Sequence, residues 1–316
     1  MLDGLSLWQA HHGSQVFSCF VDFSKAFDRV SYWKLFTQMI EEGCDACFVR
    51  LLAFWYSNQT FCVAWQGKHS SRFTMSNGTR QGGVISPYLF TRYIRPLILA
   101  LASSGIGCNI GGMAVNNFAY ADDMVLLAPS WYALQDLIRI LEYYCVKLNI
   151  ICNTKKTVCM VFKPRRRDRW VAEKFPAFTL SGCELSYVSQ IRYLGHEIND
   201  VLNDDADIKR EIKNLFARTN MLISRFRKCS VNVKLLLFKS YCMSLYDVAL
   251  WKYFSVAVFN KFRSSYNKCI KKLFGYARMD SMSGIRYLLI SLCLQLILLF
   301  TTRIFSFIDT VLRVAT

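Results

Sequence analysis

Acidic residues are scarce in this sequence. Its 316 residues include 22 Asp and Glu against 39 Lys and Arg, which gives a formal net charge of +17. Such an excess of positive charge predicts a polyanionic partner, with nucleic acid as the first candidate and an anionic membrane as the second. Charged residues make up only 19% of the chain and hydrophobic residues 53%. This composition is too apolar for a disordered chain, so we expect one large domain or two ordinary ones around a sizeable core.

The chain also lacks the sequence marks of several protein classes. The N-terminus has neither the basic start nor the apolar stretch of a signal peptide. Thirteen cysteines with irregular spacing indicate reduced thiols in the nucleus or cytoplasm rather than a disulfide scaffold. Cys44 and Cys47 have no second pair at zinc-finger spacing, so we interpret them as two packed thiols. No Walker-type phosphate loop occurs, and the glycines from Gly105 to Gly111 miss the dinucleotide fingerprint by one residue.

The longest apolar segment, near the C-terminus, is too short to cross a bilayer. Tyr287 to Thr302 contains 16 uncharged residues between two arginines. As a helix it would be about 24 Å long, against about 30 Å for the hydrocarbon core of a membrane. We therefore expect a buried helix; a partner surface and a membrane anchor are the alternatives.

The spacing of apolar residues predicts a mixed α+β fold in the first part of the chain. Val16 to Phe23 is a mostly apolar run with β-branched and aromatic residues, typical of a buried strand that ends at Asp22. A helix is expected over about Ser31 to Glu42. Two short apolar runs between Asn117 and Pro129 flank a polar pair, a pattern typical of a hairpin. Trp131 to Leu148 then has apolar residues at helical spacing.

The pattern changes near residue 200. Beyond Asn199, apolar side chains fall on a helical stripe while lysines and arginines occupy the other faces. The basic helix expected over Lys209 to Lys228 has Glu211 as its only acidic residue, and its cations would contact phosphates. Further helical, basic sequence follows through Phe274. We place a boundary near residue 200, between an α+β part and an all-helical part.

Three carboxylates could carry chemistry. Asp22 at a strand end and the pair Asp122 and Asp123 at a hairpin tip can be brought together by one sheet. Clustered carboxylates bind hard divalent cations, and two such ions about 4 Å apart support phosphoryl transfer. Aspartates also cap turns and helices, which is the structural alternative.

The residues around these carboxylates form three motifs in a fixed order. They are Phe20-Val-Asp-Phe-Ser-Lys-Ala-Phe-Asp-Arg-Val30, Arg80-Gln-Gly-Gly-Val-Ile-Ser-Pro87 and Phe118-Ala-Tyr-Ala-Asp-Asp-Met-Val125. Together they closely resemble the reverse transcriptases of non-LTR retrotransposons. The resemblance continues through Asn153-Thr-Lys-Lys-Thr157 and Tyr193-Leu-Gly-His-Glu-Ile198, and so covers roughly residues 17 to 198.

The resemblance implies a fold and a division of the chain. Residues 1–200 would form a right-hand polymerase palm with residual fingers, in which helices pack on an antiparallel sheet. Residues 201–275 would be a basic, all-helical thumb-like region. Residues 276–316 would be an apolar C-terminal helical segment.

The resemblance also implies roles in catalysis. Asp22, Asp122 and, less directly, Asp123 would be the catalytic carboxylates and the ligands of two Mg²⁺ ions, with Mn²⁺ as an alternative. Lys156 would place an ammonium group near the leaving pyrophosphate. A solvated pair with Lys155 is the alternative reading of that lysine.

Further residues would bind the substrates. Phe27 matches a steric gate, an aromatic ring that would collide with a ribose 2′-hydroxyl; a core position is the alternative. The residues expected to bind nucleotide and template are Phe27, Arg80, Gln81 and Gly82. The residues expected to grip the primer are Tyr193, Leu194 and Gly195. An ordinary tight turn is the alternative at both glycine-containing segments.

These features predict an RNA-directed DNA polymerase that extends a primer 3′-hydroxyl. Its partners would be an RNA (or DNA) template, a DNA primer and deoxynucleoside triphosphates, and a membrane is not an expected partner. Only 21 residues precede Asp22, so we expect the missing fingers or endonuclease segments to be supplied elsewhere. The alternative is a catalytically inactive retrotransposon-derived fragment that only binds nucleic acid.

Overall fold

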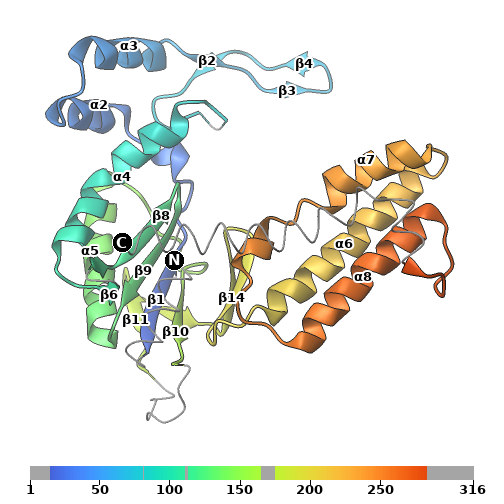
Figure 1. Ribbon diagram of the computed structural model, residues 1–316. Helices are drawn as coiled ribbons and strands as arrows, with labels where there is room; N and C mark the ends of the chain where they lie inside the picture. Colours follow the sequence, from blue (N-terminus) through green and yellow to red (C-terminus); the bar gives the residue numbers. More distant parts are fainter. Residues whose placement is uncertain (1–14, 81, 111–112, 165–174, 283–316) are drawn as a thin grey trace. The chain divides into compact units, whose positions relative to one another are not determined.

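The computed structural model describes residues 15–80, 82–110, 113–164 and 175–282 of the chain (Figure 1). The chain divides into two compact units, residues 1–190 and residues 191–316. The expected residue Gln81 and the apolar segment Tyr287 to Thr302 lie outside the described residues. No helix within the described residues is both long enough and apolar enough to cross a membrane.

The first unit is built around a six-stranded sheet with the order β11-β12-β10-β1-β9-β8. Neighbouring strands are antiparallel except for the parallel pair β10 and β12. The strand bounds are β1 Val16–Val21, β8 Asn117–Tyr120, β9 Asp123–Ala128, β10 Val158–Phe162, β11 Phe178–Leu180 and β12 Cys183–Tyr187. The expected α+β class with an antiparallel-rich sheet is therefore confirmed.

Strand β1 lies inside the sheet and is buried along its whole length. It pairs with β9 on one side and β10 on the other, and all six of its residues are buried. Alternate side chains point to opposite faces of a strand, so both faces of the sheet are covered at β1. Burial of both faces explains why the segment from Val16, which predicted a buried strand, is continuously apolar.

Two helices cover one face of the sheet in Figure 1. They are α4, Ser86–Ser103, and α5, Trp131–Leu148. Helix α5 has the bounds expected from its apolar spacing. It begins where Ser130 Oγ accepts the Ala133 N–H at 3.2 Å, and it ends at Asn149 in the left-handed conformation. The apolar faces of both helices join the main core of the unit.

Two more helices and four short strands lie between β1 and α4 in the sequence. The short 3₁₀ helix η1, Phe27–Arg29, precedes α2, Tyr32–Glu41, and α3, Ala46–Ser57. The expected helix over Ser31 to Glu42 is thus confirmed as α2. The short strands are β2 Thr60–Phe61, β3 Ala64–Trp65, β4 Lys68–His69 and β5 Phe73–Thr74. A further small hairpin joins β6 Cys108–Ile110 to β7 Met113–Val115.

The second unit begins with a hairpin and continues as helices. The hairpin pairs β13, Gln190–Tyr193, with β14, His196–Asn199. The helices are α6 Asp205–Phe226, α7 Val231–Cys242, η2 Tyr246–Leu250 and α8 Val256–Phe274. Their core includes Leu215, Leu222, Phe238, Tyr266 and Ile270.

The division between the units falls ten residues earlier than the boundary expected near residue 200. Strand β14 packs on α6 of the same unit, and the Glu197 N–H donates to Asp207 Oδ1 at 3.0 Å. The sequence change at Asn199 marks where helical periodicity begins. The compact unit starts earlier because it also holds the hairpin.

Candidate polymerase active site

The sheet brings Asp22 next to the tip of the β8–β9 hairpin. Val21, the last residue of β1, pairs with Met124 of β9. Because the two strands are antiparallel, the next residue on each is Asp22 on one and Asp123 on the other. Asp122 precedes Asp123 in the turn, so all three carboxylates predicted from the sequence gather at one edge of the sheet.

The hairpin turn that carries Asp122 is tight and unusual. Tyr120 pairs with Asp123, which leaves only Ala121 and Asp122 in the loop. Ala121 has a φ of 53°, a conformation that L residues other than glycine rarely adopt. Such a conformation costs on the order of 1 kcal/mol or more and persists only where the surroundings enforce it. Asp122, rather than Asp123, therefore occupies the tip of the hairpin, and Asp123 begins β9.

The electrostatics of Asp123 show that the three acids interact. Partial shielding from water raises the pKa of Asp123, and the negative charges of Asp122 and Asp22 raise it further. Ionised carboxylates that repel one another in this way are stabilised by a cation. The charge arrangement thus fits a metal site better than a purely structural role.

The donor set fits a hard divalent cation that is shared with substrate. Asp22 and Asp122 are half-buried and Asp123 is exposed, so oxygen ligands face solvent. Among the residues that the structure describes, no three His, Cys, Asp or Glu side chains form a complete metal-binding group. Mg²⁺ is commonly held by one or two carboxylates together with waters and substrate phosphates.

The turn from Asn153 to Thr157 is hydrogen-bonded directly to Asp22. The Asp22 N–H donates to Thr157 Oγ1 at 3.2 Å, and the Asn153 N–H donates to the Asp22 carbonyl at 2.7 Å. The neighbouring Ser24 N–H donates to the Ile151 carbonyl at 2.7 Å. The Asn153 to Thr157 turn therefore fixes the backbone that presents Asp22.

Both lysines predicted near the pyrophosphate lie on this turn. Lys155 and Lys156 are exposed between Asn153 and Thr157. The Lys156 N–H donates to the Asn153 carbonyl at 3.1 Å, which closes the turn. The sequence identified the lysines but missed Thr157 as a support for Asp22. The available signal was its position within the Asn153-Thr-Lys-Lys-Thr157 motif.

Phe27, in the first motif, contacts residues on either side of the second motif. Its ring stacks on Phe90 of α4, with ring centroids 4.7 Å apart, and its carbonyl accepts the Thr79 N–H at 2.8 Å. The Gly78 N–H donates to the Val30 carbonyl at 2.8 Å. These bonds bring the segment before Arg80 against the segment after Asp22, so two of the three motifs meet here.

The glycines after Arg80 allow a turn that other residues would obstruct. Gly82 has a φ of 77°, which glycine adopts without strain. A Cβ at Gly83 would lie 2.6 Å from Ser86 Oγ and 3.1 Å from the Arg80 carbonyl oxygen. The Gly83 N–H and the Ser86 hydroxyl both donate to that carbonyl, which holds Arg80 just before α4.

The residues predicted to grip the primer form the turn of the β13–β14 hairpin in the second unit. Leu194 and Gly195, at the tip, have φ values of 47° and 88°, and Leu194 is exposed. Tyr193 ends β13. The hairpin is supported from within its own unit by a buried charged network that the sequence did not reveal.

That network surrounds His196. Its Nε2 lies 3.7 Å from Asp204 Oδ1 and its Nδ1 lies 3.2 Å from Asp207 Oδ2. Burial disfavours the charged imidazolium, but the two carboxylates outweigh burial and raise the pKa of His196 to about 9. Nδ1 has no aligned hydrogen-bond acceptor, so the attraction is that of an ion pair.

Asp207 is the centre of the same network. Its carboxylate accepts hydrogen bonds from the Trp251 indole at 2.7 Å and from Arg210 Nε at 2.8 Å. Burial alone would raise the pKa of Asp207, but His196, Trp251 and the Glu197 N–H lower it well below the usual range. The network joins β14, α6 and Trp251, the residue that follows η2.

Helix α6 begins four residues before Lys209, so it holds Asp205 and Asp207 as well as Glu211. Arg210 forms ion pairs with both Asp207 and Glu211, at 2.7 and 2.8 Å, and is largely buried. Asp207 lies two residues before Lys209, outside the basic stretch from Lys209 to Lys228. The exposed cations of α6 and the residues after it are Lys209, Lys213, Arg225, Arg227 and Lys228.

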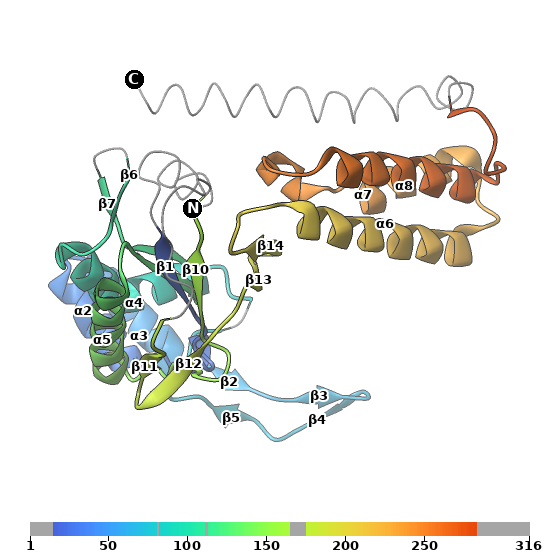
Figure 2. The same ribbon diagram turned by 90° about the horizontal axis from the view of Figure 1, so that it is seen from below.

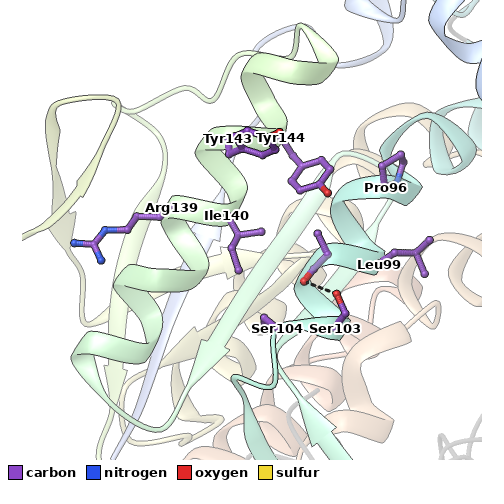
Figure 3. Close-up of a pocket in the computed structure, with 9 residues that line it drawn as sticks. Pro96, Leu99, Ser103, Ser104, Arg139, Ile140, Tyr143 and Tyr144 are labelled. Atoms are coloured by element: carbon purple, nitrogen blue, oxygen red, sulfur yellow. Dashed lines mark hydrogen bonds between the residues drawn. The ribbon is translucent and has the colours of Figure 1, made fainter.

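The cysteines and an open groove between two helices lie outside this chemistry. The twelve cysteines of the described residues are free thiols; Cys44 is half-buried and Cys47 exposed. An open groove runs between α4 and α5 and is lined by side chains of both helices (Figure 3). It is lined by Pro96, Leu99, Ala100, Ser103, Ser104, Arg139, Ile140, Tyr143 and Tyr144. None of these residues belongs to the carboxylate site.

The sheet, its covering helices and the carboxylates at the C-terminal end of β1 define the palm of a nucleic-acid polymerase. The model of the family described as reverse transcriptase (RNA-dependent DNA polymerase) matches residues 3–198. The chain belongs to this family, and the resemblance noted from its three motifs is confirmed.

Curated relatives come from insect retrotransposons. The RNA-directed DNA polymerase from mobile element jockey of Drosophila funebris is 26% identical over 278 residues, which is 82% of this chain and 28% of the relative. The Pol polyprotein of type-2 retrotransposable element R2DM of Drosophila melanogaster is 27% identical over 185 residues, or 56% of this chain and 17% of the relative. The chain thus spans less than a third of either relative.

The solved structures that match this chain include telomerases. A telomerase from Candida tropicalis, in complex with a fragment of telomeric RNA, is 13% identical with a TM-score of 0.47 and covers 91% of this chain and 47% of that one. A telomerase from Candida albicans, also with a telomeric RNA fragment, is 13% identical with a TM-score of 0.44 and covers 86% and 48%.

Proposed function

We propose that this chain is the catalytic core of an RNA-directed DNA polymerase that extends a primer 3′-hydroxyl on an RNA (or DNA) template. The observation that carries the proposal is the meeting of Asp22 with Asp122 and Asp123 at the edge of a palm sheet. These acids interact electrostatically, as the raised pKa of Asp123 shows. Family membership supports the same chemistry.

The reaction is a nucleotidyl transfer. The primer 3′-oxygen forms a bond to the α-phosphorus of a deoxynucleoside triphosphate, and the bond from that phosphorus to the pyrophosphate oxygen breaks. Asp22 and Asp122 would hold two Mg²⁺ ions, or Mn²⁺, with Asp123 as a less direct third carboxylate. When bound, these ions lower the cost of ionising the hydroxyl and neutralise charge on the pyrophosphate.

The chain's own residues orient the reactants. Lys156, on the turn bonded to Asp22, supplies positive charge or a proton near the leaving pyrophosphate. Phe27 excludes a ribose 2′-hydroxyl. Nucleotide and template contact Arg80, Gln81 and Gly82, and the primer end contacts Tyr193, Leu194 and Gly195.

The partners follow from this reaction. They are an RNA template, a DNA primer and deoxynucleoside triphosphates, in the nucleus or cytoplasm. The exposed cations of α6 and α8 offer contacts to phosphates, and such contacts make binding depend on salt.

Primer extension tests the proposal. The chain is incubated with an RNA template, an annealed DNA primer and Mg²⁺ or Mn²⁺, beside its Asp122→Ala variant. We expect product from the chain and none from the variant. Asp136→Ala is the matched control, because Asp136 is an exposed aspartate on α5 whose partner is the surface residue Arg139.

One result would favour the inactive fragment. If the unmodified chain binds the primer–template but forms no product with either metal, the polymerase proposal is wrong and a nucleic-acid-binding relic remains. If Asp122→Ala retains full activity, the assignment of the carboxylate site is wrong.

A further inference from the structure

A long hairpin between α3 and α4 stands apart from the core of the first unit. Its base pairs Thr60 with Thr74 and its tip pairs Trp65 with Lys68. Figures 1 and 2 show it projecting from α2 and α3 without a helix or strand of that unit over either face. Every residue from 62 to 77 is exposed.

Such exposure is unusual for a hairpin that carries large apolar side chains. A two-stranded hairpin alone in water is marginally stable. Here it also presents apolar side chains to solvent: Trp65 is 74% exposed, Val63 59% and Phe73 45%. Apolar surface that remains uncovered over such a length commonly marks an interaction site.

The charge of the region restricts the kind of partner. No Asp or Glu occurs from Ala46 to Ala121, whereas six lysines and arginines do. Lys68 lies directly opposite Trp65 across the hairpin, and Arg72 lies on the returning strand, one residue before Phe73, so two of these cations belong to the hairpin itself. A polyanion with flat, apolar groups complements this pattern better than an acidic or apolar protein surface does.

We propose that the hairpin from Thr60 to Thr74 binds single-stranded nucleic acid. An unpaired base stacks on Trp65, while Lys68 and Arg72 contact the flanking phosphates. The single strand is specified because bases inside a duplex are already stacked on one another and are unavailable to an aromatic ring. The inference rests on the proposed function in one respect, namely that the natural ligand is the template strand.

Binding of a fluorescein-labelled oligouridylate to the full chain, followed by fluorescence anisotropy, tests the inference. Trp65→Ala should weaken binding about 5- to 150-fold, the range for loss of one base stack. Trp65→Phe, which keeps a ring, should recover part of the loss. Trp33→Ala is the matched control, because Trp33 is 71% exposed on α2, and it should bind like the unmodified chain.

The salt dependence provides a second measurement. The Lys68→Ala/Arg72→Ala variant should reduce the slope of log K against log salt by about 1.4, since each phosphate contact to a single strand contributes about 0.7. Arg139→Ala, an exposed arginine on α5, should leave the slope unchanged. Trp65→Ala should weaken binding to an RNA duplex far less than binding to the single strand.

The results separate this inference from the polymerase proposal. Equal binding of the single strand by the chain, Trp65→Ala and Lys68→Ala/Arg72→Ala would overturn the inference even if primer extension succeeds. Loss of single-strand binding in these variants would support it even if the chain forms no product. Equal weakening of single-strand and duplex binding by Trp65→Ala would also overturn it, because a stacking platform requires unpaired bases.

Discussion

Thr157 Oγ1 accepts the backbone N–H of Asp22 at 3.2 Å, across 135 positions of sequence. Thr157 is buried, so no water replaces the bond if the hydroxyl is lost. Thr157→Val keeps the shape and removes the acceptor. We expect it to lower the free energy of unfolding by about 1–3 kcal/mol, the cost of an unsatisfied buried amide. Urea unfolding measures this change.

The same substitution should affect catalysis through the position of Asp22. A misplacement of about 1 Å at a reacting group costs on the order of 100-fold in rate. We expect Thr157→Val to lower kcat in primer extension more than it changes KM for the nucleotide. Thr157→Ser keeps the hydroxyl and should restore kcat. Equal kcat in Thr157→Val and the unmodified chain would show that the bond does not position Asp22.

Asp123 should destabilise the metal-free protein at neutral pH. Partial shielding from water and the charges of Asp122 and Asp22 raise the pKa of Asp123, so its ionised form is disfavoured in the folded state. The cost is therefore absent below about pH 4 and appears as the pH rises through the raised pKa. Asp123→Asn should raise stability at pH 7.5 by a few tenths of a kcal/mol, because the group is exposed and well screened.

Thermal unfolding in the presence of a chelator measures this gain. The matched control is Glu184→Gln, which removes an exposed carboxylate on β12 and should leave the unfolding temperature unchanged. Addition of Mg²⁺ should stabilise the unmodified chain and reduce the advantage of Asp123→Asn. A loss of stability in Asp123→Asn without metal would contradict the predicted repulsion.

Phe27 should control the choice of sugar. Its ring is fixed by stacking on the fully buried Phe90, so it cannot readily move away from a 2′-hydroxyl. Phe27→Val should raise the efficiency of ribonucleotide incorporation at least about 10-fold, the scale of discrimination that shape gives in an apolar pocket. Primer extension with each triphosphate measures the ratio. Phe27→Tyr keeps the ring and should keep the preference for deoxynucleotides. If Phe27→Val incorporates ribonucleotides and deoxynucleotides in the same ratio as the unmodified chain, the ring is only a core residue.

The sequence predicted those elements whose cause is local. Helix α5 follows from apolar residues at helical spacing and a serine cap, and β1 follows from a continuous apolar run. The three carboxylates were predicted to meet because a strand end and a hairpin can share one sheet edge. The loop was predicted at Asp122 and Asp123, but it is formed by Ala121 and Asp122. Ala121 adopts the left-handed conformation, and alanine is not a residue type that predicts such a loop.

Contacts between distant residues could not be read from the pattern. The bond from Asp22 to Thr157 depends on the antiparallel pairing of β1 with β10, which no local spacing specifies. Likewise, no local pattern singles out Asp207, an acid in the first turn of a basic helix. Only the fold shows that Trp251, 44 positions later, donates its indole N–H to that carboxylate.

The buried network around His196 should make the stability of the chain depend on pH. The groups that face His196 are the carboxylates of Asp204 and Asp207, and Arg210 pairs with the second of these. Because the pKa of His196 is raised to about 9 in the folded state, its stabilising contribution is complete below about pH 6.5. It decreases as the pH rises and is lost above pH 9.

The rise in the pKa of His196 from 6.5 to about 9 corresponds to a stabilisation of the folded state by about 3 kcal/mol at most, at 1.36 kcal/mol per pKa unit. Urea unfolding of the full chain at pH 6, 7.5 and 9.5 should therefore show falling stability. His196→Gln should be less stable at pH 6 and should lack most of this fall, because its side chain carries no titrating charge. Histidine NMR on the same two proteins should show one imidazole that titrates near pH 9 and is absent from the variant. If the two proteins lose stability equally over this range, the charge on His196 does not hold β14 on α6.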